Sequence, residues 1–148
     1  MNKLALFIMT ILLAFFGCAP KQEGKLNEIQ LNADELIEAR ALFQTHCYAC
    51  HTPRGNQDDR VAPPMIAIKR HYITDQTTQA QFIADVSTYV VTPRTDISKM
   101  PDAVRKFGMM VPLQVPKDDL KKIATFIYQQ DIEAPDWFEA HYKEEHGK

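Results

Sequence analysis

The chain of 148 residues is poor in glycine and cysteine and carries little net charge. With only 5 glycines and few stretches that alternate apolar and polar residues, it lacks the pattern of an all-β sandwich. A net charge of −2 argues against nucleic acid as the main partner, because phosphate binding needs a basic stripe. Hydrophobic residues (45%) and charged residues (24%) have the proportions of a soluble globular protein. Collagen-like, low-complexity and polytopic membrane classes are therefore excluded.

One apolar run stands out, and it lies at the start of the chain. After the positively charged Lys3, residues 4–16 are apolar at every position except Thr10. The run is short for a membrane span and is typical of a signal peptide. It is followed by Gly17-Cys18, which resembles the cleavage site of a bacterial lipoprotein, although Phe15 stands where such sites usually have leucine.

We therefore expect residues 1–17 to be a lipoprotein-type signal peptide and Cys18 to carry the lipid. An ordinary secretory signal and an uncleaved anchor are the alternatives. All three interpretations put the domain outside the cytoplasm, and lipidation would hold it on the periplasmic side of a bacterial membrane. The polar segment 18–31 is expected to form a flexible tether, and residues 32–148 to form one domain.

The domain sequence predicts an all-α fold of helices joined by proline-rich loops. Asn32, followed three positions later by Glu35, resembles a capping box at the start of a helix over about 33–46. Apolar residues at helical spacing predict further helices over about 78–91, 101–107, 118–130 and 136–145. The last of these lies in an amphipathic tail, residues 135–146.

Two of the segments between these helices are unusually long for a small domain. Residues 52–76, and residues 92–116 outside the short predicted helix, are expected to hold little regular structure. Loops of this length in a small domain are usually functional or wrapped around something. A cofactor that forms part of the core would explain both.

Cys47-Tyr48-Ala49-Cys50-His51 has the spacing C-x-x-C-H, the attachment signature of c-type haem. On a helical turn, residues i and i+3 lie on one face and residue i+4 lies beside them. The thiols of Cys47 and Cys50 can therefore form thioethers with the two vinyl groups at one haem edge, while His51 ligates the iron. With Cys18 used by the lipid, each of the 3 cysteines has a role.

Three other interpretations of the motif fit the sequence less well. A zinc site needs four ligands, and no second C-x-x-C pair is present. A thioredoxin-like redox pair is expected in a βαβ context, which the sequence does not show. A disulfide between Cys47 and Cys50 would suit an oxidising compartment but would leave His51 and the long loops unexplained. We therefore expect one covalently bound haem c.

With this motif the sequence resembles the class I cytochrome c family over about residues 33–130. The family has a small residue eight positions and an aromatic residue four positions before the first haem cysteine, where Ala39 and Phe43 stand here. Its last helix presents an aromatic residue to the first, and Phe126 is the best match. The resemblance implies the class I cytochrome c fold, with helices wrapped around a single haem.

The family also has a proline about a dozen residues after the haem histidine, and Pro63 lies 12 positions after His51. The resemblance implies that the carbonyl of Pro63 accepts the ring N–H of His51. Such a bond would fix the orientation of the imidazole and tune its basicity.

The resemblance further implies a methionine as the second iron ligand. The segment Phe107-Gly108-Met109-Met110-Val111-Pro112 resembles family segments in which F-G-x-M-P supplies it, which favours Met110. Because Val111 replaces the usual proline, Met109 and Met100 stay open as alternatives. Met65 is expected on the His51 side, packed against haem or the core.

His71 is the main candidate for a ligand other than methionine, while His46, His141 and His146 are expected to lie at the surface or in the charged tail. Basic side chains near the loops are candidates to pair with the haem propionates, together with Tyr72 and Trp137. The basic candidates are Arg54, Arg60, Lys69, Arg70 and Arg94.

The resemblance implies an electron carrier and not an enzyme. Iron held by His51 and Met110 would exchange single electrons with periplasmic or membrane-bound redox proteins, a donor and an acceptor. One alternative is a cytochrome subunit of a larger oxidoreductase, with the tail 135–146 as a docking element. The other is a ligand-binding or peroxidase-like haem protein with a labile sixth ligand.

Overall fold

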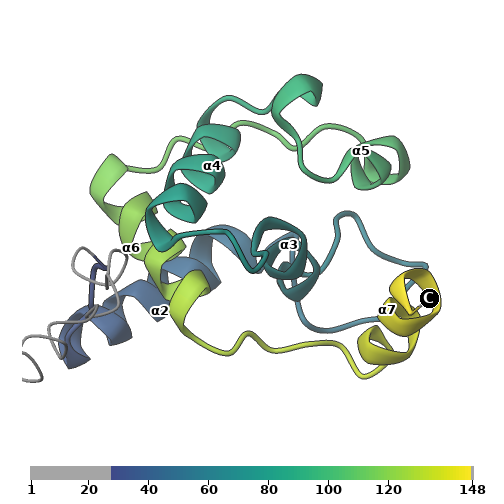
Figure 1. Ribbon diagram of the computed structural model, residues 1–148, viewed down its shortest axis with the longest axis horizontal. Coiled ribbons are helices and arrows are strands. Elements are labelled where there is room, and N and C mark those ends of the chain that lie inside the picture. Colours follow the sequence, from purple (N-terminus) through teal and green to yellow (C-terminus); the bar gives the residue numbers. More distant parts are fainter. Residues whose placement is uncertain (1–27, 148) are drawn as a thin grey trace, which may run out of the picture.

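The computed structural model describes residues 28–147. The predicted signal peptide, Cys18 and most of the predicted tether lie outside this range. Within it the chain forms six α-helices and a short 3-10 helix, with no β-strand, so the predicted all-α fold is confirmed (Figure 1). No helix among the described residues is long and apolar enough to cross a membrane.

The helices follow one another in the order expected from the sequence, with one additional α-helix and a short 3-10 helix. In chain order they are α2 (Ala33–Cys47), α3 (Met65–Tyr72), α4 (Gln79–Val91), the 3-10 helix η1 (Thr95–Ile97), α5 (Pro101–Phe107), α6 (Lys117–Gln129) and α7 (Phe138–His146). Each of the five predicted helices is found within two residues of its expected ends.

Local capping explains where several of these helices begin and end. The Asn32 side chain accepts the Glu35 N–H at 3.0 Å, and the Glu35 carboxylate accepts the Asn32 N–H at 2.9 Å, which completes the predicted capping box of α2. Thr78 caps α4 by accepting the N–H of Gln81 at 3.2 Å. Gly108 ends α5 with a φ of +83°, a conformation that glycine adopts without steric cost.

Helix α3 is the addition, and the prediction of little regular structure over 52–76 is wrong for residues 65–72. Pro64 stands immediately before the helix in an extended conformation, where its missing N–H costs nothing. The N–H of Met65 donates to the carbonyl of His51 at 3.2 Å, which satisfies one of the free donors of the first turn. The prolines that suggested a loop thus start a helix.

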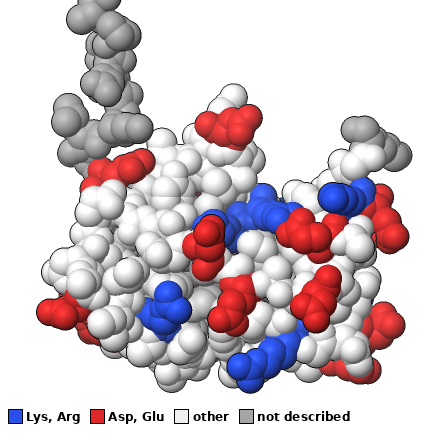
Figure 2. All heavy atoms as spheres, turned by 90° about the horizontal axis from the view of Figure 1, so that it is seen from below, with Lys and Arg blue, Asp and Glu red and all other residues white. Residues whose placement is uncertain are grey.

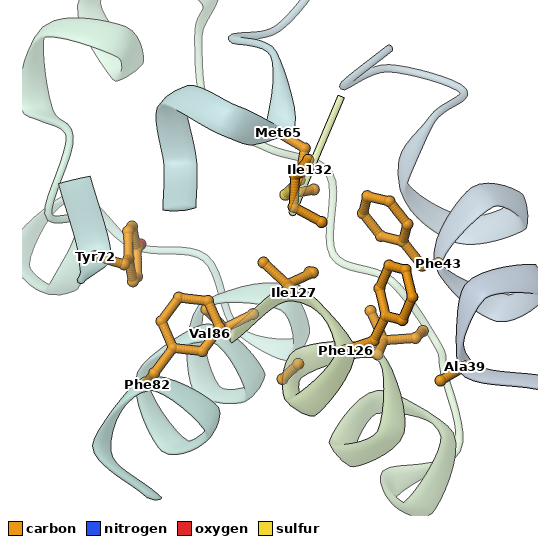
Figure 3. Close-up of a cluster of buried hydrophobic side chains, with 11 residues drawn as sticks. Ala39, Phe43, Met65, Tyr72, Phe82, Val86, Phe126, Ile127 and Ile132 are labelled. Atoms are coloured by element: carbon orange, nitrogen blue, oxygen red, sulfur yellow. The ribbon is translucent and has the colours of Figure 1, made fainter. Parts of the chain in front are cut away.

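Helix α6 is the centre of the packing, because it lies against α2 on one side and α4 on the other (Figure 1). At the crossing with α2, Ala39 is fully buried, and the rings of Phe43 and Phe126 lie with their centroids 5.4 Å apart (Figure 3). The three residues matched to the cytochrome c pattern therefore meet where that pattern requires them. Towards α4, Ile127 of α6 lies in the same buried cluster as Phe82.

The N-terminal end of the described chain is attached to the domain by a buried amide side chain. Gln79 is 2% exposed. Its side chain accepts the N–H of Ile29 at 2.6 Å and donates to the carbonyl of Ile29 at 2.9 Å, while Gln129 donates to the same carbonyl. The predicted tether 18–31 is therefore bound to the domain at residue 29.

Acidic and basic side chains are interspersed on the face of the molecule shown in Figure 2, with no large area of one sign. Some of them pair across elements, as Lys122 does with Glu38 at 2.8 Å and Arg70 does with Glu139. These pairs are partly exposed, so each contributes little to stability.

Candidate functional site

A cavity of about 370 Å³ lies beside the core, between the end of α2, the loop after it, α3, α4, α5, the segment after α5, and α6. Its lining is mainly apolar, from residues such as Tyr72, Phe82, Val86, Val104, Leu120, Ile123 and Ile127. Both long connections, 52–76 and 92–116, contribute to its walls. The two connections, together with the short helices that they contain, thus enclose one apolar space.

The C-x-x-C-H motif lies at the edge of this cavity. Cys47 is the last residue of α2, and the chain continues in a turn in which the N–H of His51 donates to the carbonyl of Cys47 at 2.8 Å. This turn keeps Cys47, Cys50 and His51 close together, and all three line the cavity. Two thiols and one imidazole are therefore presented to the same apolar space.

The ring of His51 is held in one orientation by Pro63, as predicted. Its Nδ1 lies 2.8 Å from the Pro63 carbonyl, and because a carbonyl can only accept, Nδ1 carries the hydrogen. Burial lowers the pKa of His51 and the nearby Arg60 guanidinium lowers it further, against the opposing effect of the hydrogen bond to Pro63. The imidazole is therefore neutral, with the Nε2 lone pair free for a metal.

The surroundings of Cys47 do not suit a thioredoxin-like nucleophile. Burial raises the pKa of its thiol to about 12, whereas a reactive cysteine needs a lowered pKa. Both thiols are free in the structure. Residues 28–147 contain no group of three or more His, Cys, Asp or Glu side chains placed to hold a metal ion, so the zinc interpretation lacks its further ligands.

Four methionines line the cavity, and three of them, Met100, Met109 and Met110, are the candidates for the second iron ligand. Met100 and Met110 are half-buried, whereas Met109 is 42% exposed and its sulfur lies 3.7 Å from the hydroxyl of Tyr89, which donates to it. The structure therefore gathers all three candidates at one site and gives Met109 a separate partner.

This arrangement fits a covalently attached haem. Two thiols and a neutral imidazole lie at the edge of an apolar cavity that methionine side chains also line. The sequence pattern of the family described as Cytochrome c matches residues 37–131 of the chain. The chain belongs to the cytochrome c family. Members bind haem c covalently, typically one per domain, and carry electrons. Searches of curated proteins and of solved structures returned no match.

Met65 lies on the histidine side of the cavity of this cytochrome. It is 6% exposed, belongs to the buried hydrophobic cluster, and its N–H is bonded to the His51 carbonyl. The expectation that Met65 packs in the core is confirmed.

The other histidines of the cytochrome differ in their relation to the cavity. His71 lies outside the lining, with its Nδ1 2.8 Å from the carbonyl of Ala67 and its ring next to that of His146. His46, expected to face solvent, is instead half-buried and lines the cavity. His141 lies in α7 and pairs with Gln57 at 3.2 Å.

Tyr72 lines the cavity, as a residue near the haem would, but the basic candidates for pairing with haem propionates lie elsewhere. Lys69 donates to the Gln130 carbonyl, Arg70 pairs with Glu139, and Arg94 pairs with Asp96. Trp137 donates to the carbonyl of Gly55 at 3.0 Å instead.

Arg60, expected as a candidate partner of the haem propionates, bonds instead to the backbone that follows His51. Its guanidinium donates to three carbonyls, those of Thr52, Arg54 and Ala62. Nothing in the local sequence distinguishes it from the other basic residues of the loop. Its contact with Trp137, a residue far along the chain, appears only once the chain is folded.

Proposed function

We propose that this cytochrome is a monohaem carrier of single electrons, with iron ligated by His51 and Met110 and thioether bonds at Cys47 and Cys50. The observation that carries the proposal is the His51 imidazole, which is neutral, held by Pro63 and next to two thiols at an apolar cavity. When bound there, haem c supplies an iron that gains or loses one electron.

The surroundings of Met110 support it as the second ligand. It is half-buried in the cavity lining and lies two residues after Gly108, whose φ of +83° redirects the backbone. The same segment is tied to α4 by the N–H of Leu113, which donates to the carbonyl of Val90 at 3.0 Å. A thioether favours the reduced state and leaves no vacant position for a substrate.

Exposed apolar side chains at the cavity rim support electron exchange with protein partners. Val61 is 70% exposed and Val111 is 74% exposed, yet both line the cavity, as does the exposed Cys50. An apolar rim of this kind suits the small, transient interfaces of redox proteins. We propose that the donor and the acceptor both dock at this rim.

Lipid at Cys18 would hold the cytochrome on the periplasmic side of a bacterial membrane, near membrane-bound redox complexes. The sequence supports this through the apolar run and Gly17-Cys18. From Cys18 to Ile29, where the domain holds the backbone, the chain spans at most about 40 Å. A Cys18→Ser variant tests it: we expect membrane-bound wild type and a released variant, and equal fractionation of the two would contradict lipidation.

The carrier interpretation is favoured over the subunit interpretation because the tail is already packed. Phe138 of α7 is 2% exposed, and its ring lies 5.0 Å from the Arg70 guanidinium, so the apolar side of the tail contacts its own domain. The open-site interpretation has one feature in its favour, since Val111 stands where the pattern has proline.

Carbon monoxide binding to the reduced cytochrome separates a closed site from an open one. With sulfur from Met110 on the iron, we expect slow and incomplete binding by wild type and fast binding by Met110→Ala. Rapid, stoichiometric binding by wild type would contradict the carrier proposal and favour the ligand-binding or peroxidase-like alternative.

A further inference from the structure

One side chain, that of Arg60, bonds to three backbone carbonyls of the loop between His51 and Pro63. Arg60 donates through Nε to the carbonyl of Ala62 at 3.2 Å and through Nη1 to the carbonyl of Arg54 at 3.0 Å. Its Nη2 donates to the carbonyl of Thr52, the residue directly after His51. The Arg60 guanidinium therefore joins the part of the loop that follows His51 to the part that precedes Pro63. These are the residues that supply the imidazole and the carbonyl that orients it.

Helix α7 and Trp137, the residue just before it, pack against this guanidinium and the loop. The Arg60 guanidinium lies 5.6 Å from the centroid of the Trp137 ring, and the indole N–H donates to the carbonyl of Gly55. Gln57 of the same loop pairs with His141 at 3.2 Å. Helix α7 lies beyond residues 37–131, so this packing is not part of the matched cytochrome c region.

Helix α7 is itself fixed to the domain through α3. The Arg70 guanidinium lies 5.0 Å from the ring centroid of Phe138 and 4.7 Å from that of Tyr142, and it pairs with Glu139. Helix α7 therefore contacts Arg70 of α3 on one side, and Trp137 at its start contacts Arg60 and the loop on the other.

We propose that Arg60, held by Trp137, is a positioning residue for the iron site and sets its reduction potential. The inference rests on the proposed function, since it needs iron at His51. Oxidised iron carries one more positive charge than reduced iron, and a fixed cation nearby repels that charge. Because Arg60 is half-buried, solvent screens it less than an exposed arginine. Arg60 therefore favours the reduced state.

The midpoint potential of the holoprotein tests this proposal. We expect Arg60→Gln to lower it, shifting the equilibrium with a redox dye several-fold towards oxidised protein. Arg54→Gln is the matched control, because it removes the same charge from an exposed side chain of the same loop, and we expect a much smaller shift. An Arg60→Gln potential equal to that of wild type or of the control would overturn the proposal.

Two further variants separate the charge of Arg60 from its hydrogen bonds. Arg60→Lys keeps the charge but cannot reach three carbonyls, so its potential should stay closer to wild type than that of Arg60→Gln; an equal fall in both would overturn the electrostatic explanation. Trp137→Leu should speed amide hydrogen exchange over residues 54–62 and lower the potential by less than Arg60→Gln does. Unchanged exchange there would overturn the role of Trp137.

Failure of this inference is distinguishable from failure of the proposed function. Wild type without covalent haem would refute the proposed function itself. An Arg60→Gln holoprotein with normal haem attachment and an unchanged potential would refute the inference alone. If Arg60→Gln yields no holoprotein, the potential of Trp137→Leu and its exchange over residues 54–62 decide the matter.

Discussion

Met109 and Met110 are neighbours in the chain but have different surroundings. The sulfur of Met109 accepts the hydroxyl of Tyr89 at the surface, whereas Met110 is half-buried in the cavity lining. The choice between them cannot be made from the sequence, because the F-G-x-M-P pattern is incomplete at Val111. Burial and an existing partner are properties of the folded chain.

Substitution of each methionine identifies the ligand. Thioether ligation gives ferric haem a weak absorption band at the red end of the visible spectrum. We expect Met110→Ala to abolish this band and to lower the midpoint potential, because a soft ligand that favours ferrous iron is lost. Met109→Ala and Met100→Ala should keep the band. A band that survives in Met110→Ala would show that the assignment is wrong.

At the residue scale, the local parts of the site are the ones that sequence predicts. Cys47, Cys50 and His51 follow from spacing along one turn, and Pro63 follows from its distance to His51 in the cytochrome c pattern. The role of Arg60 could not be predicted in this way, since it depends on a loop closing around the guanidinium.

At the level of elements, the crossing of α2 and α6 stabilises the fold through contacts between protein side chains alone. Phe43 is 2% exposed and Phe126 is 3% exposed, with their rings in contact. The aromatic pair contributes through the apolar area that it buries and through its tilted ring geometry.

Truncation at this crossing should be costly. We expect Phe43→Ala to lower the free energy of unfolding by about 3–5 kcal/mol, because it leaves a cavity against α6. Guanidinium unfolding of the holoprotein, followed by far-UV circular dichroism, measures the loss. The control is Ile37→Ala on the same helix, whose side chain is 70% exposed and should cost less than about 0.5 kcal/mol. Equal effects of the two would contradict the assigned crossing.

The buried amide of Gln79 should determine whether the N-terminal segment stays on the domain. Gln79→Ala removes both of its bonds to Ile29, and we expect a loss of about 1–3 kcal/mol together with faster amide exchange around residue 29. Gln81→Ala serves as the control, because Gln81 is exposed and its side chain bonds only to Asp85. Unchanged exchange in Gln79→Ala would show that the segment is held by other contacts.

Most helices could be predicted from the spacing of their apolar residues, and capping side chains at Asn32 and Thr78 also mark the starts of α2 and α4. Helix α3 could not, because the two prolines that precede it are typical of a loop. Its first turn depends on the bond from Met65 to His51, which is a tertiary contact.

At the scale of the whole molecule, the framework is formed by α2, α6 and α4, while α3 and α5 lie on the other side of the cavity (Figure 1). None of the residues of α5 is buried. Helix α5 therefore packs little against the protein itself, and we expect haem to supply the missing part of the core there.

Protein that cannot attach haem should therefore lose structure. We expect a Cys47→Ala and Cys50→Ala double variant to have lower helicity and a broader unfolding transition than the holoprotein, because the native state loses the free energy of haem binding. Circular dichroism during heating measures both. Native helicity and a sharp transition in the haem-free double variant would contradict the view that haem completes the core.

The most direct measurement is the intact mass of wild type produced in a host that can mature c-type cytochromes, taken with the reduced-minus-oxidised spectrum. The account predicts a red protein whose mass exceeds that of the processed polypeptide by one haem, with that mass on the peptide containing Cys47 and Cys50. A colourless protein without added mass, or haem removable by acid and organic solvent, would contradict it.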